Sequence, residues 1–131
     1  MSSQPTRVLI AEDEALIRLD LKEMLEEEGY VVVAEVGDGQ AAVEQARHLR
    51  PDLVIVDVQM PVLDGLGATR RIRAEVAADR QPHIVALTAS ALTDDRAACA
   101  AAGFDAFLSK PVRQADLDTA LSVVRGRSTT G

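Results

Sequence analysis

Aromatic residues are scarce in this chain of 131 residues, and tryptophan is absent. Modules that bind single-stranded nucleic acid stack the bases on aromatic side chains, so an aromatic content of 2% argues against that class. The net charge of −7 also disfavours a phosphate-binding surface, which needs a stripe of basic residues. Nucleic acid is therefore not an expected partner.

Long apolar runs are absent as well, and none approaches the roughly 20 residues that a membrane-spanning helix needs. The start of the chain, Met1 to Pro5, has no apolar segment of the kind found in secretory signals. Cys99 is the single cysteine, so it cannot form an internal disulfide, and a small buried thiol is its ordinary interpretation. These absences predict a cytoplasmic protein that does not contact a membrane.

Short apolar runs alternate with longer amphipathic stretches along the chain, as in parallel α/β proteins. The apolar runs predict five strands, at residues 8–11, 31–36, 53–56, 84–87 and 106–109. The second run is more polar than the others, which places it near an edge of the sheet. Helical spacing, capping residues, glycine and proline predict helices at residues 14–28, 40–49, 66–78, 93–102 and 114–124.

This alternation predicts a doubly wound (βα)5 sandwich of the flavodoxin-like type, with a five-stranded parallel sheet and right-handed crossovers. The length suits one domain with a single core. We expect that domain at residues 7–125, preceded by a disordered segment at 1–6 and followed by a flexible polar tail at 126–131.

Charged and polar residues follow four of the predicted strands, where packing alone does not require them. Asp57 follows the apolar run 53–56, and Lys110 follows the last predicted strand. Glu12 and Asp13 follow the first strand, and Thr88 follows the fourth. Ligands of open parallel sheets bind outside the carboxyl ends of the strands, so we expect these five side chains to form one site.

Three carboxylates at close range repel one another, so such a cluster either raises some of its own pKa values or binds a cation. Hard oxygen ligands with access to water suit Mg²⁺. The alternative is that the acids only cap the helices that follow them, which is reasonable for Asp13 and Glu14. It is weak for Asp57, because Pro61 disfavours a helix that begins directly after it.

Lys110 could pair with a carboxylate at rest and hold a phosphoryl oxygen when one is present. The hydroxyl of Thr88 could donate to the same oxyanion, although a threonine in a strand needs no functional reason. A carboxylate can act as a covalent nucleophile and form an aspartyl phosphate, and the metal and the lysine would neutralise the charge of the transferred group. The residues therefore favour phosphoryl transfer to Asp57.

These residues resemble the receiver domain of bacterial two-component response regulators, over nearly the whole chain from residue 7 to about residue 124. The resemblance rests on four motifs in combination: Glu12-Asp13, the loop from Asp57 through Met60-Pro61 to Asp64-Gly65, Thr88-Ala89, and Lys110-Pro111. It implies that Asp57 accepts the phosphoryl group. It also implies a magnesium site, made by Glu12, Asp13, Asp57 and the backbone carbonyl of Gln59.

The resemblance further implies that Thr88 and Lys110 contact the phosphoryl oxygens and that Thr88 and Phe107 move on activation. The expected donor is a histidine kinase or a histidine phosphotransfer protein. The chain would be no enzyme beyond its own phosphorylation and dephosphorylation. Output to a downstream protein or a second copy would use the face of the fourth helix, the fifth strand and the fifth helix, with Arg96, Cys99, Phe107, Arg113 and Asp116.

The sequence departs from many relatives at two positions: Glu12 replaces an aspartate, and Phe107 replaces a tyrosine or threonine. Gln59 and Ser90 lie where side chains tune the phosphoryl lifetime in this family. The N-terminal half resembles receivers of RNA-binding antitermination regulators, and the C-terminal half resembles receivers of hybrid sensor kinases. A recombined or engineered receiver scaffold without a native output is one hypothesis for this difference.

Two rival functions use similar residues or the same topology. A phosphohydrolase of the haloacid dehalogenase type would need a second aspartate two residues after the nucleophile, where this chain has Gln59. A flavin carrier would need a phosphate loop rich in serine, threonine and glycine after Ala11. The acids from Glu12 to Glu14 would instead repel the phosphate.

Overall fold

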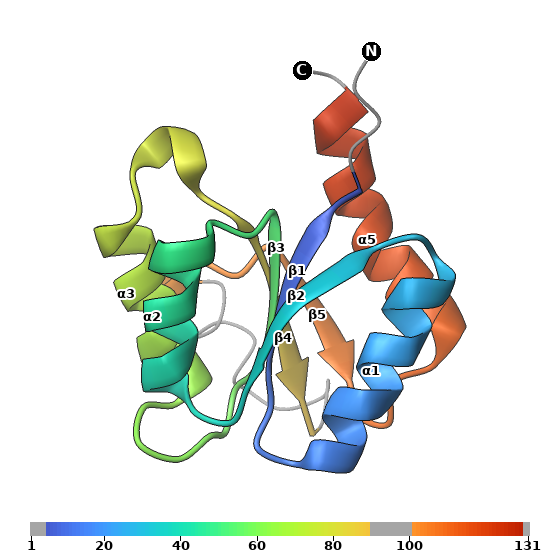
Figure 1. Ribbon diagram of the computed structural model, residues 1–131, viewed down its shortest axis with the longest axis horizontal. Coiled ribbons are helices and arrows are strands. Elements are labelled where there is room, and N and C mark those ends of the chain that lie inside the picture. The colour runs from blue at the N-terminus through green and yellow to red at the C-terminus, as the bar shows by residue number, and fades with distance from the viewer. Residues whose placement is uncertain (1–4, 90–100, 130–131) are drawn as a thin grey trace.

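Five parallel strands form one sheet at the centre of the structure, in the order β2-β1-β3-β4-β5 (Figure 1). The computed structural model describes residues 5–89 and 101–129, with the side chains of its last helix described up to residue 122. The strands are β1 (Arg7–Ala11), β2 (Val31–Val36), β3 (Leu53–Asp57), β4 (His83–Thr88) and β5 (Ala106–Ser109). All five predicted strands are present, and Asp57 and Thr88 are the last residues of theirs.

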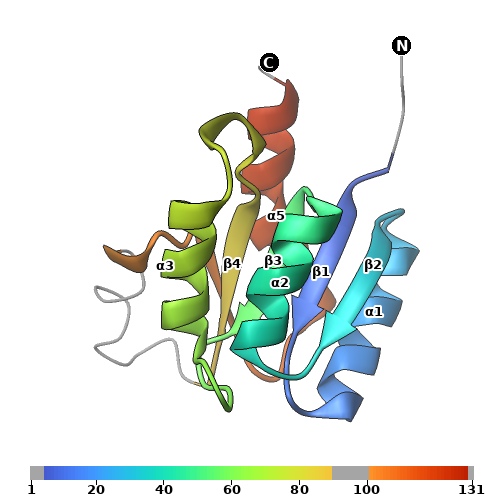
Figure 2. The ribbon, with the colours of Figure 1, turned by 60° about the vertical axis from the view of Figure 1, so that its left-hand side comes forward.

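Helices cover both faces of the sheet (Figures 1 and 2). One face carries α1 (Ala15–Glu27) and α5 (Gln114–Thr129), and the other carries α2 (Gly39–Leu49) and α3 (Gly65–Glu75). The predicted helix 93–102 lies outside the described residues except for its last two, and so do Ser90, Arg96 and Cys99. The strand order and the layers confirm the predicted α/β flavodoxin-like class.

The core consists of two apolar layers, one on each side of the sheet, and β3 shows how one strand supplies both. Leu53 and Ile55 pack with the layer that contains residues of α1 and α5, whereas Val54 and Val56 pack with α2 and α3. All four side chains are fully buried, and each such burial stabilises the fold by about 1.5–3 kcal/mol. Asp57 is thereby held on a rigid central strand.

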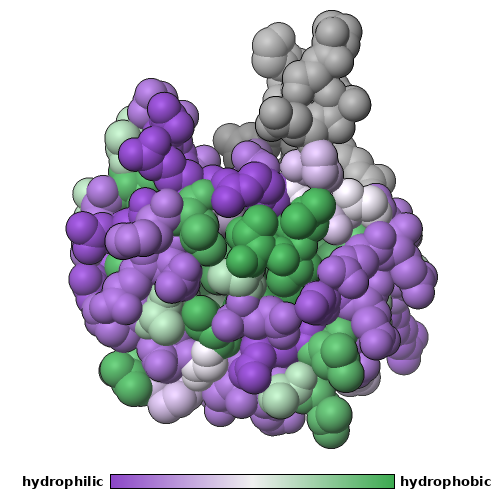
Figure 3. Space-filling view, in the orientation of Figure 1, coloured by the Kyte–Doolittle hydropathy of each residue, from purple (hydrophilic) through white to green (hydrophobic). Residues whose placement is uncertain are grey.

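The edge strand β2 is the strand that the sequence predicted to be less buried. It pairs with β1 alone among the described strands, and none of its six residues is fully buried. Figure 3 shows apolar side chains near the middle of this face, where β2 runs in Figure 1. The register with β1 shifts after Val8, and such an irregularity twists an edge and hinders pairing with another chain.

Two helix ends differ from the prediction. Helix α3 ends at Glu75 rather than residue 78, because Val76 is extended (φ −90°, ψ 137°). The side-chain amide of Gln81 donates to the carbonyl oxygen of Val76 at 2.7 Å and to that of Ile72 at 3.3 Å, which satisfies the open end of the helix. A short 3₁₀ helix, Ala78–Arg80, follows.

Helix α5 is longer than predicted, since it continues to Thr129 rather than ending at residue 124. Residues 126–129, which were assigned to the polar tail, are therefore helical. Gly126 led to the early end, but a glycine inside a helix costs only about 1 kcal/mol and no proline follows it. Within the part of the chain that is described, no helix has the length and apolar character needed to cross a membrane.

Arg73 joins α3 to the segment before β5. Its Nε and Nη2 atoms donate to the carbonyl oxygen of Gly103 at 3.0 and 2.6 Å, and Nη2 also donates to Asp105 Oδ2 at 2.8 Å. The same carboxylate oxygen accepts from the backbone N–H of Ile84 at 2.8 Å. This network fixes the start of β4 and β5, and with it the two strands that end at Thr88 and before Lys110.

Candidate functional site

Asp57 ends β3 and is almost fully buried, with 3% of its surface exposed. Its Oδ1 atom accepts a hydrogen bond from the backbone N–H of Gln59 at 2.9 Å. Its Oδ2 atom accepts from Lys110 Nζ at 2.6 Å. A buried carboxylate is costly unless it is paired, and these two donors compensate both of its oxygens.

Glu12 directly follows β1, next to β3, and is fully buried. Its Oε2 atom accepts from the backbone N–H of Glu14 at 2.8 Å, so it supports the start of α1 as the capping interpretation expects. Its Oε1 atom faces the site instead and accepts from Lys110 Nζ at 3.0 Å. One ammonium group thus bridges two buried carboxylates.

Asp13 is exposed and completes the predicted acidic cluster. One carboxylate oxygen from each of Glu12, Asp13 and Asp57 lies within 4.8 Å of the other two. The strand order reverses between β1 and β3, and ligands of this topology bind at that point. The three acids predicted to converge are therefore together, in an arrangement that could hold a hard cation.

The electrostatics of the cluster change two pKa values. Burial, and next the hydrogen-bonding side chain of Asp57, raise the pKa of Glu12 from 4.5 to about 7. Burial by itself would lower the pKa of Lys110, but its hydrogen bonds to Asp57 and Glu12 outweigh this, so that pKa lies above its ordinary value. The lysine stays charged while Glu12 can hold a proton near neutrality.

Glu12 is expected to make the stability of the metal-free protein fall as the pH rises. Its pKa is higher in the folded state than the ordinary 4.5, so the folded state binds the proton more tightly, and this stabilisation is lost between about pH 4.5 and 7. The decline is at most about 3 kcal/mol. Urea denaturation followed by circular dichroism from pH 5 to 8 should show it in the wild type and not in Glu12→Gln. Parallel curves for the two proteins would contradict the assignment.

Thr88 ends β4, the strand next to β3. Its Oγ1 atom is buried and has no hydrogen-bond partner among the described residues. A buried hydroxyl without a partner costs about 1–3 kcal/mol and calls for an explanation. A ligand oxygen in the site would supply one. Ala89 follows Thr88, is exposed, and lines a groove that Lys110 also lines.

The loop from Asp57 to Gly65 is held by backbone hydrogen bonds and contains one strained residue. The N–H of Gly65 donates to the carbonyl oxygen of Val58 at 2.9 Å, and the N–H of Leu63 donates to that of Pro61 at 2.7 Å. Val62, which lies between Pro61 and Leu63, has φ +69° and is 82% exposed. A β-branched residue rarely adopts this conformation, and such strain gathers at functional sites. No feature of the sequence marks Val62 in advance.

The roles predicted for Gln59 and Phe107 are not tested by the contacts described for them. Gln59 is exposed, and its backbone N–H contacts Asp57, whereas metal ligation by its carbonyl oxygen stays a prediction. Phe107 on β5 is half-buried, with its ring centre 6.4 Å from that of Phe104 and the two planes tilted by 42°. Its movement on activation also stays a prediction.

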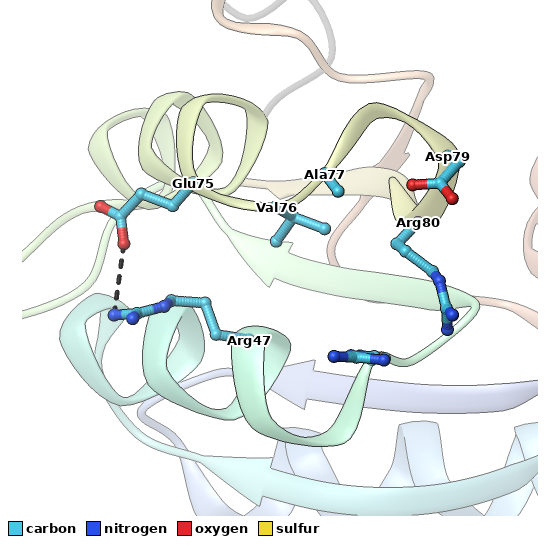
Figure 4. Close-up of a pocket in the computed structure, with 7 residues that line it drawn as sticks. Arg47, Glu75, Val76, Ala77, Asp79 and Arg80 are labelled. Atoms are coloured by element: carbon cyan, nitrogen blue, oxygen red, sulfur yellow. Dashed lines mark ion pairs between the residues drawn. The ribbon is translucent and has the colours of Figure 1, made fainter.

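A cavity lies at the edge of the sheet opposite the Asp57 cluster, between the C-terminal ends of α2 and α3 (Figure 4). Arg47 Nη1 pairs with Glu75 Oε1 there at 3.4 Å, and Arg80 also lines it. Basic residues at the C-terminal ends of helices interact favourably with the helix dipole, which accounts for Arg47 without a ligand. The cluster around Asp57 is therefore the candidate site.

The family model described as the response regulator receiver domain matches residues 8–122. The chain belongs to this family. Membership in the receiver family replaces the two rival hypotheses, a phosphohydrolase of the haloacid dehalogenase type and a flavin carrier. It also agrees with the position of the four motifs, whose residues follow or end β1, β3, β4 and β5.

The curated relatives differ in how much of their own length the chain matches. The transcriptional regulatory protein PdtaR of Mycobacterium tuberculosis is 51% identical over 123 residues, which are 94% of this receiver and 58% of PdtaR. The chain thus spans little more than half the length of that relative. Protein CcdB of Bacillus subtilis is 33% identical, and the match covers 92% of this chain and 98% of CcdB. Because PdtaR matches both halves, a recombined origin is not needed to explain their different resemblances.

A solved relative carries a metal in the corresponding fold. The receiver domain of the sensor histidine kinase PA1611 from Pseudomonas aeruginosa is 37% identical, with a TM-score of 0.81. The match covers 93% of this chain and 99% of that one, and the structure has a magnesium ion coordinated in its active site cleft. In this receiver the acidic cluster of Glu12, Asp13 and Asp57 offers the oxygen ligands that such an ion prefers.

Proposed function

We propose that this receiver is a phosphorylation-dependent switch that accepts a phosphoryl group on Asp57 from a histidine kinase or a histidine phosphotransfer protein. The observation that carries the proposal is the pairing of Asp57 with Lys110 at 2.6 Å, at the end of the strand beside β4, where the hydroxyl of Thr88 has no partner among the described residues. The carboxylate is a nucleophile, and the ammonium and hydroxyl groups are donors for the oxygens of the incoming group. A cytoplasmic location belongs to the same proposal.

The transfer forms one bond and breaks one. A carboxylate oxygen of Asp57 attacks the phosphorus of a phosphohistidine, the P–N bond breaks, and the imidazole keeps the electron pair and takes up a proton. Lys110 neutralises charge on the transferred oxygens, because its ammonium already lies between Asp57 and Glu12. Beyond this reaction and the hydrolysis of the aspartyl phosphate, in which water releases inorganic phosphate and restores the carboxylate, the receiver performs no catalysis in this proposal.

Mg²⁺ is the proposed cofactor, and the residues fit it. Glu12, Asp13 and Asp57 each present an oxygen, and the backbone carbonyl of Gln59 is the fourth proposed ligand. Carboxylates at close range repel one another, and the pKa of Glu12 is raised by its burial first and by the neighbouring side chain of Asp57 next. When bound, the ion supplies charge neutralisation for phosphoryl transfer.

The proposed switch follows from adding a dianionic group beside a buried acid. The phosphoryl oxygens on Asp57 repel Glu12 and attract the hydroxyl of Thr88, which would move toward them. That movement would free space near Phe107 on β5, whose ring can then turn inward. Output would pass through β5 and α5, with exposed Arg113 just before α5 and exposed Asp116 within it, together with the helix predicted at residues 93–102.

The donor protein must bring its phosphohistidine to Asp57, and a groove beside Lys110 offers a place for it. Most of its lining residues are apolar, and two exposed acidic residues, Glu14 and Asp20, also line it. It is lined by Glu14, Ile17, Asp20, Leu21, Met24, Ala89, Lys110, Pro111 and Val112. A donor helix with apolar residues flanked by basic ones would complement this surface.

Intact-mass spectrometry tests the proposal. Incubation with acetyl phosphate and Mg²⁺ is expected to add the mass of one phosphoryl group to the wild type, and Asp57→Asn should show none. The conservative control Asp64→Asn, in the same loop, should still be phosphorylated, since Asp64 caps α3 by accepting from the N–H of Gly67 at 2.8 Å. Uptake that persists in Asp57→Asn would overturn the assigned site.

A further inference from the structure

Arg18 on α1 holds the peptide group between the two acidic residues that follow β1. Its Nη1 atom lies 2.5 Å from the backbone carbonyl oxygen of Glu12 and donates a hydrogen bond to it. That carbonyl belongs to the peptide bond linking Glu12 to Asp13. The contact therefore fixes the backbone from which both carboxylates project.

The guanidinium group is itself held from the edge strand. Its Nε atom lies 3.9 Å from Glu35 Oε1 on β2, and Lys22 Nζ lies 3.6 Å from the other oxygen of Glu35. A Cβ atom added to Gly37 would lie 3.6 Å from Arg18 Nη1 and 4.0 Å from the Cα of Asp13. Arg18 is thus packed between the turn after β2 and the backbone of the acidic cluster.

Comparing Arg18 with Lys22 separates an effect on backbone orientation from an effect of charge, because Arg18 donates to the Glu12 carbonyl and Lys22 pairs with Glu35. Both cations are on α1 and lie near Glu35 of β2. A pair at such distances and exposures contributes little to stability by itself. The hydrogen bond to a carbonyl next to the ligands acts on geometry, and Mg²⁺ demands a near-ideal arrangement of its ligands.

We propose that Arg18 is a positioning residue for the Mg²⁺ site, acting through the carbonyl group of Glu12 and held in place by Glu35. The inference rests on the proposed function, because it assumes that Glu12 and Asp13 bind the ion. Groups that orient metal ligands change affinity or activity by 10- to 100-fold, and we expect the lower end because Arg18 acts through backbone.

Isothermal titration calorimetry with Mg²⁺ measures the effect directly. Arg18→Met is expected to weaken Mg²⁺ binding about tenfold, and Lys22→Met, the matched control, by less than about twofold. At saturating Mg²⁺ the phosphorylation rate of Arg18→Met should return to within about twofold of the wild type, which a general loss of structure would not allow. Arg18→Lys keeps the charge but not the guanidinium group, and it should resemble Arg18→Met.

The outcomes separate this inference from the proposed function. If the wild type binds Mg²⁺ and the Arg18 variants bind it with the same or higher affinity, the role of Arg18 is overturned and the proposed function is not. A wild type without Mg²⁺ binding would overturn both. If Arg18→Met melts at a lower temperature in the absence of Mg²⁺, the comparison uses Arg18→Lys, and an affinity equal to the wild type in that variant overturns the inference.

Discussion

Gly65→Ala is expected to lower the free energy of unfolding by about 3 kcal/mol, the upper range for overpacking a well-packed site. A Cβ atom at this position would lie 2.3 Å from the carbonyl oxygen of Asp57 and 2.8 Å from the Cα of Val58. Both neighbours are backbone atoms on a buried strand or directly after it, so neither can move easily. Urea denaturation of the two proteins at pH 7 measures the difference.

Gly67→Ala is the matched control, two residues further along the same helix. A Cβ atom there would lie 2.7 Å from Leu63 Cδ1, the end of a flexible side chain that can turn away. Alanine also favours the helix by up to about 1 kcal/mol relative to glycine. Gly67→Ala should therefore stay within about 1 kcal/mol of the wild type. Equal losses in both variants would show that the close approach of α3 to Asp57 is not the cause.

Lys110→Met is expected to destabilise the metal-free protein at pH 8 by about 3 kcal/mol, since removing one partner of a buried ionic group leaves the other uncompensated. Asp57 and Glu12 both lose their ammonium partner. The loss should shrink as the pH falls below about 7, because Glu12 takes up a proton and the repulsion disappears. Denaturation curves of both proteins at pH 6 and 8 check this.

Phosphorylation should suffer as well, by about a hundredfold or more, because Lys110 is the charge that contacts Asp57 and would contact the transferred oxygens. Lys22→Met again serves as the control, since Lys22 pairs with Glu35 and touches neither acid. Equal phosphorylation rates of Lys110→Met and Lys22→Met, or a stability loss of Lys110→Met that does not depend on pH, would contradict the role assigned to Lys110.

The sequence predicted the sheet and the site because both depend on local patterns. Apolar runs such as 53–56 define buried strands, and the residue types after them define the chemistry. Parallel strands bring their carboxyl ends to one edge, so Asp57, Glu12 and Lys110 could be placed together before any distance was known. The edge position of β2 followed in the same way from its more polar pattern.

Features that depend on contacts between distant segments were not predictable from these patterns. The end of α3 is decided by the side chain of Gln81, and the bridge from Arg18 to the Glu12 carbonyl requires the helix to lie over the strand end. The positive φ of Val62 could not be predicted, because valine is not a residue type that favours this conformation. Helix α5 passes Gly126 because propensity is a weak guide where no proline stops the helix.

Residue identity and family resemblance contributed differently to the site. The nucleophilic role proposed for Asp57 and the phosphoryl contact proposed for Lys110 followed from chemistry at the strand ends. The ligand role proposed for the Gln59 carbonyl and the movement proposed for Phe107 came from the resemblance alone. The hydroxyl of Thr88, which has no partner within residues 5–89 and 101–122, is an independent structural observation that favours a role for this residue in the site.

Chemical trapping of the phosphorylated residue shows directly which side chain carries the phosphoryl group. Borohydride reduces an acyl phosphate of aspartate to homoserine, which peptide mass spectrometry can locate after treatment with acetyl phosphate and Mg²⁺. We expect homoserine at position 57 in the treated sample and not in the untreated one. Homoserine at another position, or a phosphoryl group that resists borohydride on a serine, threonine or histidine, would contradict it.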